Sequence, residues 1–395
     1  MEDVISLQGQ HQTKVNKEIL TSTILITVTI LSLMISNTFL KDVYNYFINE
    51  IIIIGDFNIH HIVNDFLMAI FFLSVGIEIK KEILYGNLSS IKKAGFPIIA
   101  ALGGVITPAI IFSVLTYNTN FSSGAGIPIS TDIAFAVGIF TIFKNKLDSK
   151  LKIFLLSLAV VDDLISILVI GILYSSQIDL FSLFLAFLTM GLLVFMNKML
   201  KRESIYPYLI IGMFLWYFIF KSGVHTTISG VLLAMCMPSS KGNDDISTKL
   251  SHKLEPICNF FILPLFAFIN TGISFNIEMN FMEVEPLIKG ILFGLVIGKP
   301  LGITLFSYIA CKMHLVEKPK NVDWISIIQV SMLAGIGFTM SIFVTELAFE
   351  GMEQIIDISK VTILISALLS VMLSFLTIKL KPYLAKDNIK ILNHR

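Results

Sequence analysis

The chain has 395 residues, of which 55% are hydrophobic and only 14% are charged. Soluble domains carry about 25% charged residues, so this composition excludes an ordinary soluble protein and indicates a polytopic membrane protein. A net charge of +1 provides no global field to attract nucleic acid, and the three cysteines show no metal-ligand spacing. We therefore expect an all-α protein embedded in membrane lipid, with no nucleic-acid partner and no cofactor.

Apolar segments of near-spanning length recur along the whole chain. They lie at about 19–38, 62–80, 95–117, 125–143, 151–174, 179–197, 205–220, 222–238, 257–273, 287–311, 325–348 and 358–380. This pattern predicts twelve transmembrane helices, if the short pair at 205–238 counts as two. They form a transporter membrane domain at 19–382, between a cytoplasmic segment at 1–18 and a cytoplasmic tail at 383–395.

The orientation follows from the lysines and arginines. When alternate loops are assigned to opposite sides, 24 of the 29 basic residues fall on the side of both termini and 4 on the other side. Cytoplasmic loops carry such an excess, so both termini are expected in the cytoplasm. An odd number of spans would mix the two sets, which also favours twelve.

The loop after the first span contains Glu50, four consecutive isoleucines at 51–54, and a Gly55-Asp56 turn before a second short apolar stretch. Runs of β-branched residues around such a turn are typical of a β-hairpin, here on the external side. The alternative, that the isoleucines extend a membrane helix, stays open.

The fourth and eleventh spans are irregular. Pro128 and the cap sequence Ser130-Thr131-Asp132 predict a helix, a break and a second helix within the fourth span. Glycines around 335–337 weaken the eleventh in the same way. Each interrupted span is the middle member of three, which predicts inverted repeats around a midplane site.

Charged residues lie inside other spans. Asp162 and Asp163 stand in the middle of an apolar run, where a carboxylate is costly, and Lys299 lies inside the tenth span. We expect Lys299 to pair with one of the two aspartates. Asp132 suits the positive ends of broken helices, and a cation suits the negative ends.

Six short motifs resemble the NhaA sodium/proton antiporters. They are STDIAFA at 130–136, VDDL at 161–164, KSGVH at 221–225, LPLFAF at 263–268, GKPLG at 298–302 and GIGFTMS at 335–341. The likeness runs in order from about residue 17 to 382. It implies electrogenic exchange of Na+ or Li+ for protons across the bacterial inner membrane, by a homodimer that contributes to pH homeostasis and salt tolerance.

The resemblance also implies roles for individual residues. Asp162 and Asp163 would hold the transported ion or the proton, with Thr131 beside them. Asp132 and Lys299 would compensate two crossed half-helices, and Lys299 would pair with Asp162.

A pH-responding region is implied as well, and here the chain departs from the family. The candidate residues are Glu78, Glu82, His225, Lys249, His252 and Glu255. Ser251 and Glu255 stand where the family carries an acid and a second histidine, and Lys81 stands where an arginine is usual. From composition alone, the stretch around His252 is a solvated turn. A lone histidine such as His225 more often forms a hydrogen bond at a helix end than acts as a catalytic group.

The chemistry needs little beyond these residues. Carboxylate oxygens are hard ligands that suit Na+ or Li+, and a site that holds either protons or Na+ gives obligatory exchange through alternating access. An intramembrane aspartyl hydrolase would take its two acids from separate helices, and a channel would form rings from repeated subunits. A transporter of organic anions with sodium on the same fold is the main alternative.

Overall fold

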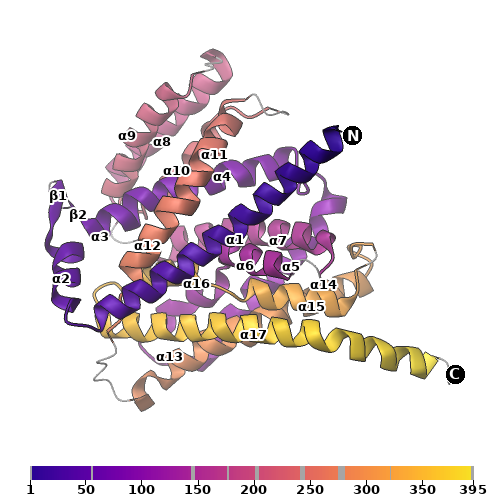
Figure 1. Ribbon diagram of the computed structural model, residues 1–395. Helices are drawn as coiled ribbons and strands as arrows, with labels where there is room; N and C mark the ends of the chain where they lie inside the picture. The colour runs from indigo at the N-terminus through magenta and orange to yellow at the C-terminus, as the bar shows by residue number, and fades with distance from the viewer. Residues whose placement is uncertain are drawn as a thin grey trace. The chain divides into compact units, whose positions relative to one another are not determined.

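The computed structural model describes residues 2–54, 57–143, 147–175, 178–200, 204–240, 245–274, 281–320 and 322–392 (Figure 1). Most of these residues are helical. The helices in them include nine that are long and apolar enough to cross a membrane, and a tenth such span if one bent pair counts as a single span. The prediction of an all-α polytopic membrane protein is confirmed.

Two compact units divide the chain, and the first comprises Met1–Thr23, Ala94–Asp162 and Glu278–Arg395. The second comprises Ile24–Lys93 and Asp163–Ile277. Three helices have residues in both units, α1 (Glu2–Ser36), α5 (Ile91–Leu115) and α7 (Ser149–Leu173). One of the four sequence boundaries between the units falls inside α7, directly after Asp162.

The first unit contains the predicted third and fourth spans, the first half of the fifth, and the tenth to twelfth. Its other elements are α5 (Ile91–Leu115, which starts three residues earlier), η3 (Ser122–Ile129), α6 (Ile133–Ile142), α13 (Phe281–Phe293), η6 (Gly294–Gly298), α14 (Lys299–Lys312), α15 (Trp324–Ala334), α16 (Phe338–Ala348) and α17 (Glu353–Leu392). In Figure 1, α17 lies alongside α13 and α15, and it contacts both. A Cβ on Gly103 of α5 would lie 2.2 Å from the Gly302 carbonyl oxygen of α14, so glycine permits this close approach.

The second unit holds the remaining elements. These are α2 (Lys41–Asn45), η1 (Tyr46–Glu50), β1 (Ile52–Ile54), β2 (Phe57–Asn58), α3 (Ile59–His61), η2 (Ile62–Leu67), α4 (Met68–Leu84), α8 (Leu180–Phe195), η4 (Met196–Leu200), α9 (Tyr206–Lys221), α10 (Ile228–Cys236), α11 (Ile246–Ile257), η5 (Cys258–Ile262) and α12 (Leu263–Asn270). The stretch expected to hold two short spans forms α9, with 16 residues, and α10, with 9.

The strands β1 and β2 pair antiparallel, with Ile52 opposite Asn58 and Ile54 opposite Phe57. The predicted turn, Gly55-Asp56, lies outside the described residues. The isoleucines at 52–54 are therefore a strand and do not continue a helix.

The fourth span is interrupted where the cap sequence stands. The 3₁₀ helix η3 ends at Ile129, residues 130–132 are non-helical, and α6 begins at Ile133. In the eleventh span, α15 and α16 are separated by residues 335–337 and meet at a bend of 47°. Both interruptions leave helix ends inside the first unit. The backbone amides and carbonyls at these ends have no partner within their own helix, so they are available to bind side chains.

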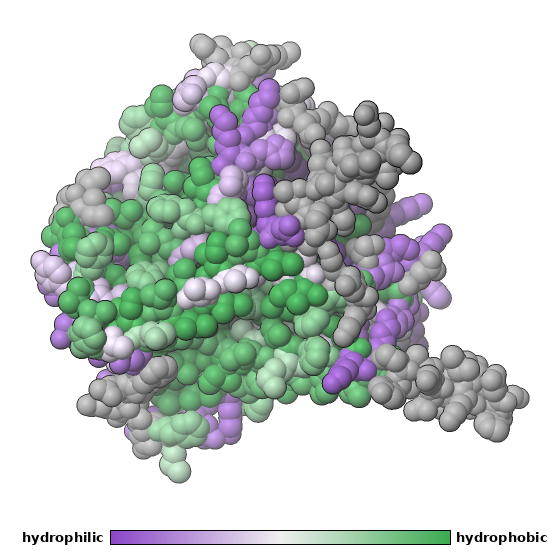
Figure 2. Space-filling view, viewed as in Figure 1, coloured by the Kyte–Doolittle hydropathy of each residue, from purple (hydrophilic) through white to green (hydrophobic). Residues whose placement is uncertain are grey.

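The molecular surface is rich in apolar residues. Figure 2 shows apolar side chains over much of its coloured face. On α8, Phe181, Phe184 and Phe187 are all more than half exposed. Apolar side chains outside and charges inside fit a lipid environment, because lipid tails accept the former and cannot solvate the latter.

Candidate functional site

A fully buried ion pair lies at the centre of the first unit. The Lys299 ammonium, at the start of α14, is 2.6 Å from Oδ2 of Asp162 in the middle of α7, and both side chains are at most 1% exposed. Removing two charges from water is expensive, so the pair persists only with good geometry and further hydrogen bonds. Those bonds come from the interrupted helices.

The C-terminal ends of two helices, with their free carbonyl groups, lie beside this pair. Lys299 donates to the carbonyl of Ile129, the last residue of η3. The Thr131 hydroxyl lies 2.5 Å from Oδ2 of Asp162 and 2.9 Å from the carbonyl oxygen of Ala334, the last residue of α15. A cation and a hydroxyl donor thus stand where the helix dipoles are negative.

Asp132 lies at the two amide ends. One carboxylate oxygen accepts the backbone N–H of Phe135 at 2.9 Å and so caps α6. The other oxygen accepts the backbone N–H of Thr339 at 3.2 Å and also its hydroxyl, in the first turn of α16. The Asp132 backbone N–H donates to the Ile336 carbonyl at 2.8 Å. One carboxylate therefore neutralises two positive helix ends.

The Asp162 carboxylate can accept a further ligand. Its second oxygen, Oδ1, is buried and has no hydrogen-bond partner within the described residues. A carboxylate, a hydroxyl and carbonyl oxygens within one small region are hard ligands for a small monovalent cation. No cluster of three or more histidine, cysteine or acidic residues suited to a resident metal occurs in the described parts of the chain.

Asp163 follows on α7 and is 4% exposed. Neighbours on a helix differ by about 100° in direction, so the two carboxylates do not share one face of α7. Both side chains are buried within the protein.

Five of the pH-response candidates come from two helices that contact each other. Glu78 and Glu82 lie on α4, and α11, which packs against α4, carries Lys249, His252 and Glu255. The three side chains on α11 are exposed, and Glu82 accepts the backbone N–H of Asn87 at 2.8 Å.

His225 belongs elsewhere, in the turn between α9 and α10. Its Nδ1 lies 3.0 Å from the Thr227 hydroxyl, and the intervening Thr226 donates to Asp65, near the start of the helix that continues as α4. Lys80, near the other end, donates to the Met235 carbonyl. Fifteen helical residues span about 22 Å, so His225 is not brought together with the other five.

Sequence reasoning missed several polar contacts that are buried or partly buried. Thr339 donates to Asp132, although the two residues are 207 positions apart in sequence. Thr339 lies in the motif GIGFTMS at 335–341, but the motif gave no sign of this contact. Glu18 pairs with Lys152 at 2.6 Å and accepts the Thr141 hydroxyl at 2.8 Å. No local pattern could have paired residues so far apart in sequence.

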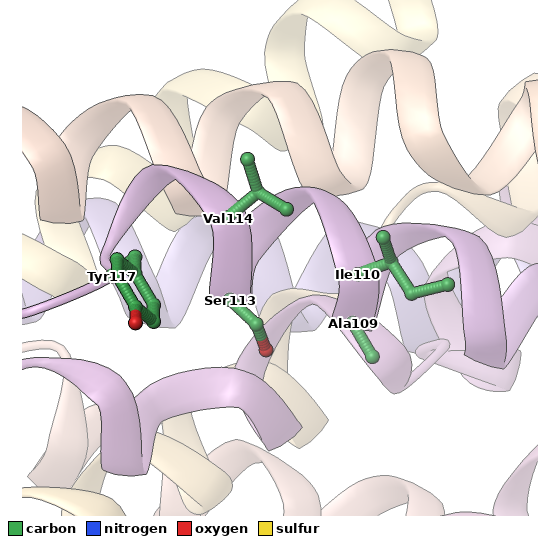
Figure 3. A pocket seen from close by; sticks show the side chains of 5 residues that line it. All are labelled: Ala109, Ile110, Ser113, Val114 and Tyr117. Carbon is green, nitrogen blue, oxygen red and sulfur yellow. The ribbon is translucent and has the colours of Figure 1, made fainter.

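A surface hollow on α5 is not part of this site. It is lined by Ala109, Ile110, Ser113, Val114 and Tyr117 (Figure 3). Ile110, Val114 and Tyr117 are more than half exposed, and none of the candidate residues lines the hollow.

Comparison with known proteins identifies similar chains of the same length. A family model described as Na+/H+ antiporter 1 matches residues 12–378. The Na(+)/H(+) antiporter NhaA 2 of Aliarcobacter butzleri is 41% identical over 384 residues, covering 93% of this chain and 96% of the relative. The Na(+)/H(+) antiporter NhaA of Cytophaga hutchinsonii is 44% identical over 358 residues, with 90% and 92% covered.

Proposed function

The chain belongs to the Na+/H+ antiporter family, and we propose that it exchanges Na+ or Li+ for H+ at a site formed by Asp162, Asp163 and Thr131. The related chains are named as antiporters, which supports a role as a transporter and not an enzyme. The observation that carries the site assignment is the buried Asp162 carboxylate, which has one oxygen without a partner in the described chain.

Exchange follows from competition at this carboxylate. A Na+ ion that binds both oxygens must displace the Lys299 ammonium, which lies 2.6 Å from Oδ2. Protons and Na+ neutralise the same negative charges, so the site holds one or the other. Alternating exposure of the site to the two sides of the membrane then couples Na+ movement in one direction to H+ movement in the other. More than one proton per Na+ makes the exchange electrogenic.

Asp132 and Lys299 compensate the ends of two interrupted helices that cross within the first unit. Their carboxylate and ammonium contact the amide ends and a carbonyl end of these half-helices. Apart from the second half of the fifth span, the first unit unites the two triplets of spans that were predicted to be inverted repeats, which supports that relation.

The topology is of twelve transmembrane helices in the bacterial inner membrane, with both termini cytoplasmic. Nine long helices, the bent pair α15–α16, and the short α9 and α10 supply these spans in the described chain. The membrane domain is residues 19–382, between cytoplasmic segments at 1–18 and 383–395. A homodimer is formed through the β1–β2 hairpin, and the residues on α4 and α11, with His225, modulate the response to pH.

The first experiment replaces Asp163 with asparagine. In everted membrane vesicles, Na+ added to the wild type should release protons without any organic substrate, whereas Asp163→Asn should release none while the protein remains inserted. The amide keeps the size of the side chain but cannot lose a proton. Wild-type exchange by this variant would contradict the site assignment.

The matched control for that variant is an aspartate directly before the same helix. Asp148 is exposed and precedes α7, and in the interactions described its carboxylate accepts only a local backbone N–H, from Lys150 at 2.9 Å. Asp148→Asn should leave exchange at the wild-type level. A need for an organic anion in the wild-type assay would favour the organic-anion alternative instead.

A further inference from the structure

Glu18 of α1 binds two other helices with one carboxylate. Its Oε1 and Oε2 lie 2.8 Å and 2.6 Å from the Lys152 ammonium on α7, and Oε2 also accepts the Thr141 hydroxyl of α6 at 2.8 Å. Thr141 is 3% exposed, and the side chains of Glu18 and Lys152 are 17% and 23% exposed. All three residues lie in the first unit, outside the proposed ion site. We call them the brace.

The brace contacts the same two helices that meet at the ion site. Thr131, directly before the cap of α6, lies 2.5 Å from the Asp162 carboxylate of α7. The brace contacts these helices again, at Thr141 and Lys152. On each of the two helices the contacts are ten positions apart. The helix α6 therefore runs antiparallel to α7, and the two are joined at two levels about 15 Å apart.

The register of α6 against α7 determines where the Thr131 hydroxyl lies. The half-helix α6 has only ten residues, with the cap Asp132 at its start. Because the residues of a short helix move together, a slide of α6 along α7 at the brace displaces Thr131 by a similar distance. The ligands of a functional site must be held within about 0.5 Å of their productive geometry, so even a small slide matters.

The helix α1 lies directly against α6 between these two levels. The Ser22 hydroxyl is 3.1 Å from the Ala134 carbonyl oxygen of α6. A Cβ on Gly138 would lie 1.6 Å from the Ser22 Oγ, so glycine permits this close approach. The backbone of α1 is thus fixed against α6 one turn away from Glu18, which holds the carboxylate in place between α6 and α7.

We propose that Glu18 is a positioning residue for the exchange, which fixes the register of α6 against α7 and thereby the place of the Thr131 hydroxyl beside Asp162. At about 15 Å from the site along α7, Glu18 does not touch the transported ion and acts through α6. The inference rests on the proposed exchange at Asp162 and Thr131, and it adds a determinant of the Na+ affinity.

The test measures exchange against Na+ concentration in proteoliposomes for the wild type and Glu18→Ala. Alanine removes the carboxylate and with it the links to both helices. We expect the Michaelis constant for Na+ to rise about tenfold, the lower end of what loss of an orienting contact costs a metal site. The maximal rate should stay within about twofold, because Asp162 and Asp163 are intact and saturating Na+ restores occupancy.

Two further variants separate position from charge. Thr141→Val keeps every charge but removes the hydroxyl that links α6 to Glu18, so the Michaelis constant should rise here too, by about threefold or more. Glu18→Gln removes the charge, but its amide oxygen can still accept the Thr141 hydroxyl. Its Michaelis constant should therefore lie between those of the wild type and Glu18→Ala.

A glutamate in an ion pair away from α6 and α7 provides the control. Glu285 of α13 pairs with Lys289, four residues on, at 2.7 Å. Glu285→Ala removes one carboxylate and one ion pair, as Glu18→Ala does, but should leave the Michaelis constant at the wild-type value.

Three results would overturn the proposal. The first is a Michaelis constant for Glu18→Ala within about twofold of the wild type. The second is a rise in Glu18→Ala with none in Thr141→Val, which would assign the effect to the charge of Glu18. The third is a joint fall of melting temperature and maximal rate at a constant Michaelis constant, which would identify a purely structural contact. Failure of the underlying exchange is distinguishable, because the wild type would then move no protons in response to Na+.

Discussion

Lys299 is held in place by a carboxylate and a helix-end carbonyl at once. Its ammonium contacts the Asp162 carboxylate and the Ile129 carbonyl, and it lies at the carbonyl end of η3. Each of these interactions offsets part of the cost of burying a charge, and none would suffice alone. A second buried pair, Glu346 with Lys360 at 2.6 Å, retains 13% and 9% side-chain exposure. Among the ion pairs of the described residues, the pair at the interruptions is the one whose two side chains are at most 1% exposed.

Removal of Lys299 should therefore destabilise the protein as well as impair transport. Lys299→Ala leaves Asp162 charged and without its cation, a loss on the order of 3–5 kcal/mol in proteins generally. We expect a clear fall in the melting temperature of the detergent-solubilised protein.

The control for this variant is Lys289→Ala. Lys289 pairs with Glu285 at 2.7 Å, but the side chains are 48% and 42% exposed, and such pairs contribute at most about 1 kcal/mol. Equal melting temperatures for Lys299→Ala and the wild type would mean that the buried pair contributes no net stability.

At the scale of elements, Asp132 joins two half-helices. Its carboxylate caps α6 through Phe135 and binds the first turn of α16 through Thr339. Asp132→Ala should cost about 1 kcal/mol for each helix end, hence about 2 kcal/mol, while asparagine should be intermediate because it keeps one acceptor oxygen. Melting curves of the purified variants provide the measurement.

Asp179 provides the comparison for this prediction, because it caps α8 through Phe181 at 3.2 Å and Ser182 at 3.1 Å. Asp179→Ala should lower the melting temperature less than Asp132→Ala. The reverse order would show that the bond across to α16 adds nothing to the cap of α6.

The hairpin also supports a prediction at this scale. β1 and β2 contain three and two residues, and a two-stranded sheet with a free edge is marginal alone. A second copy that pairs with it would stabilise it, so deletion of residues 51–59 should yield monomers that still transport. Light scattering of the detergent-solubilised protein measures the mass, and dimers that persist after deletion would place the interface elsewhere.

The interruptions show what a sequence can and cannot predict here. Pro128 and the cap sequence at 130–132 marked one break, and the glycines at 335 and 337 marked the other, because these signals act locally on the backbone. The contact between Asp132 and Thr339 depends on packing over 207 residues, which no local signal encodes. The same holds for His225, which sequence grouped with residues on α11 but which lies at the other end of α4.

At the scale of the whole molecule, the chain is divided into two units, and one of the sequence boundaries between them lies between Asp162 and Asp163. The first unit contributes Asp162 with its fixed partners Lys299 and Thr131. Transport needs both the chemistry of the carboxylates and a change of access, so a pH effect can arise from either. The two origins differ in their kinetics.

If Na+ and protons compete for Asp162 and Asp163, the apparent Michaelis constant for Na+ should rise as pH falls. Below the pKa of the site, mass action gives about a tenfold rise per pH unit for each proton that must leave. The maximal rate should change much less, because saturating Na+ displaces the protons. Na+-concentration curves at several pH values in proteoliposomes measure both quantities.

Competition at the site requires no separate sensor, so the same dependence should persist in His252→Ala. His252 is exposed on α11, in the stretch where this chain departs from the family. The variant therefore tests whether the candidate pH-response residues are needed for the effect. A Michaelis constant that stays flat with pH while the maximal rate collapses would refute competition. If His252→Ala then abolished the pH dependence of the maximal rate, the pH response would be assigned to a gate formed by α4 and α11. In that case access to the site would change with pH, while the affinity of the carboxylates for Na+ would not.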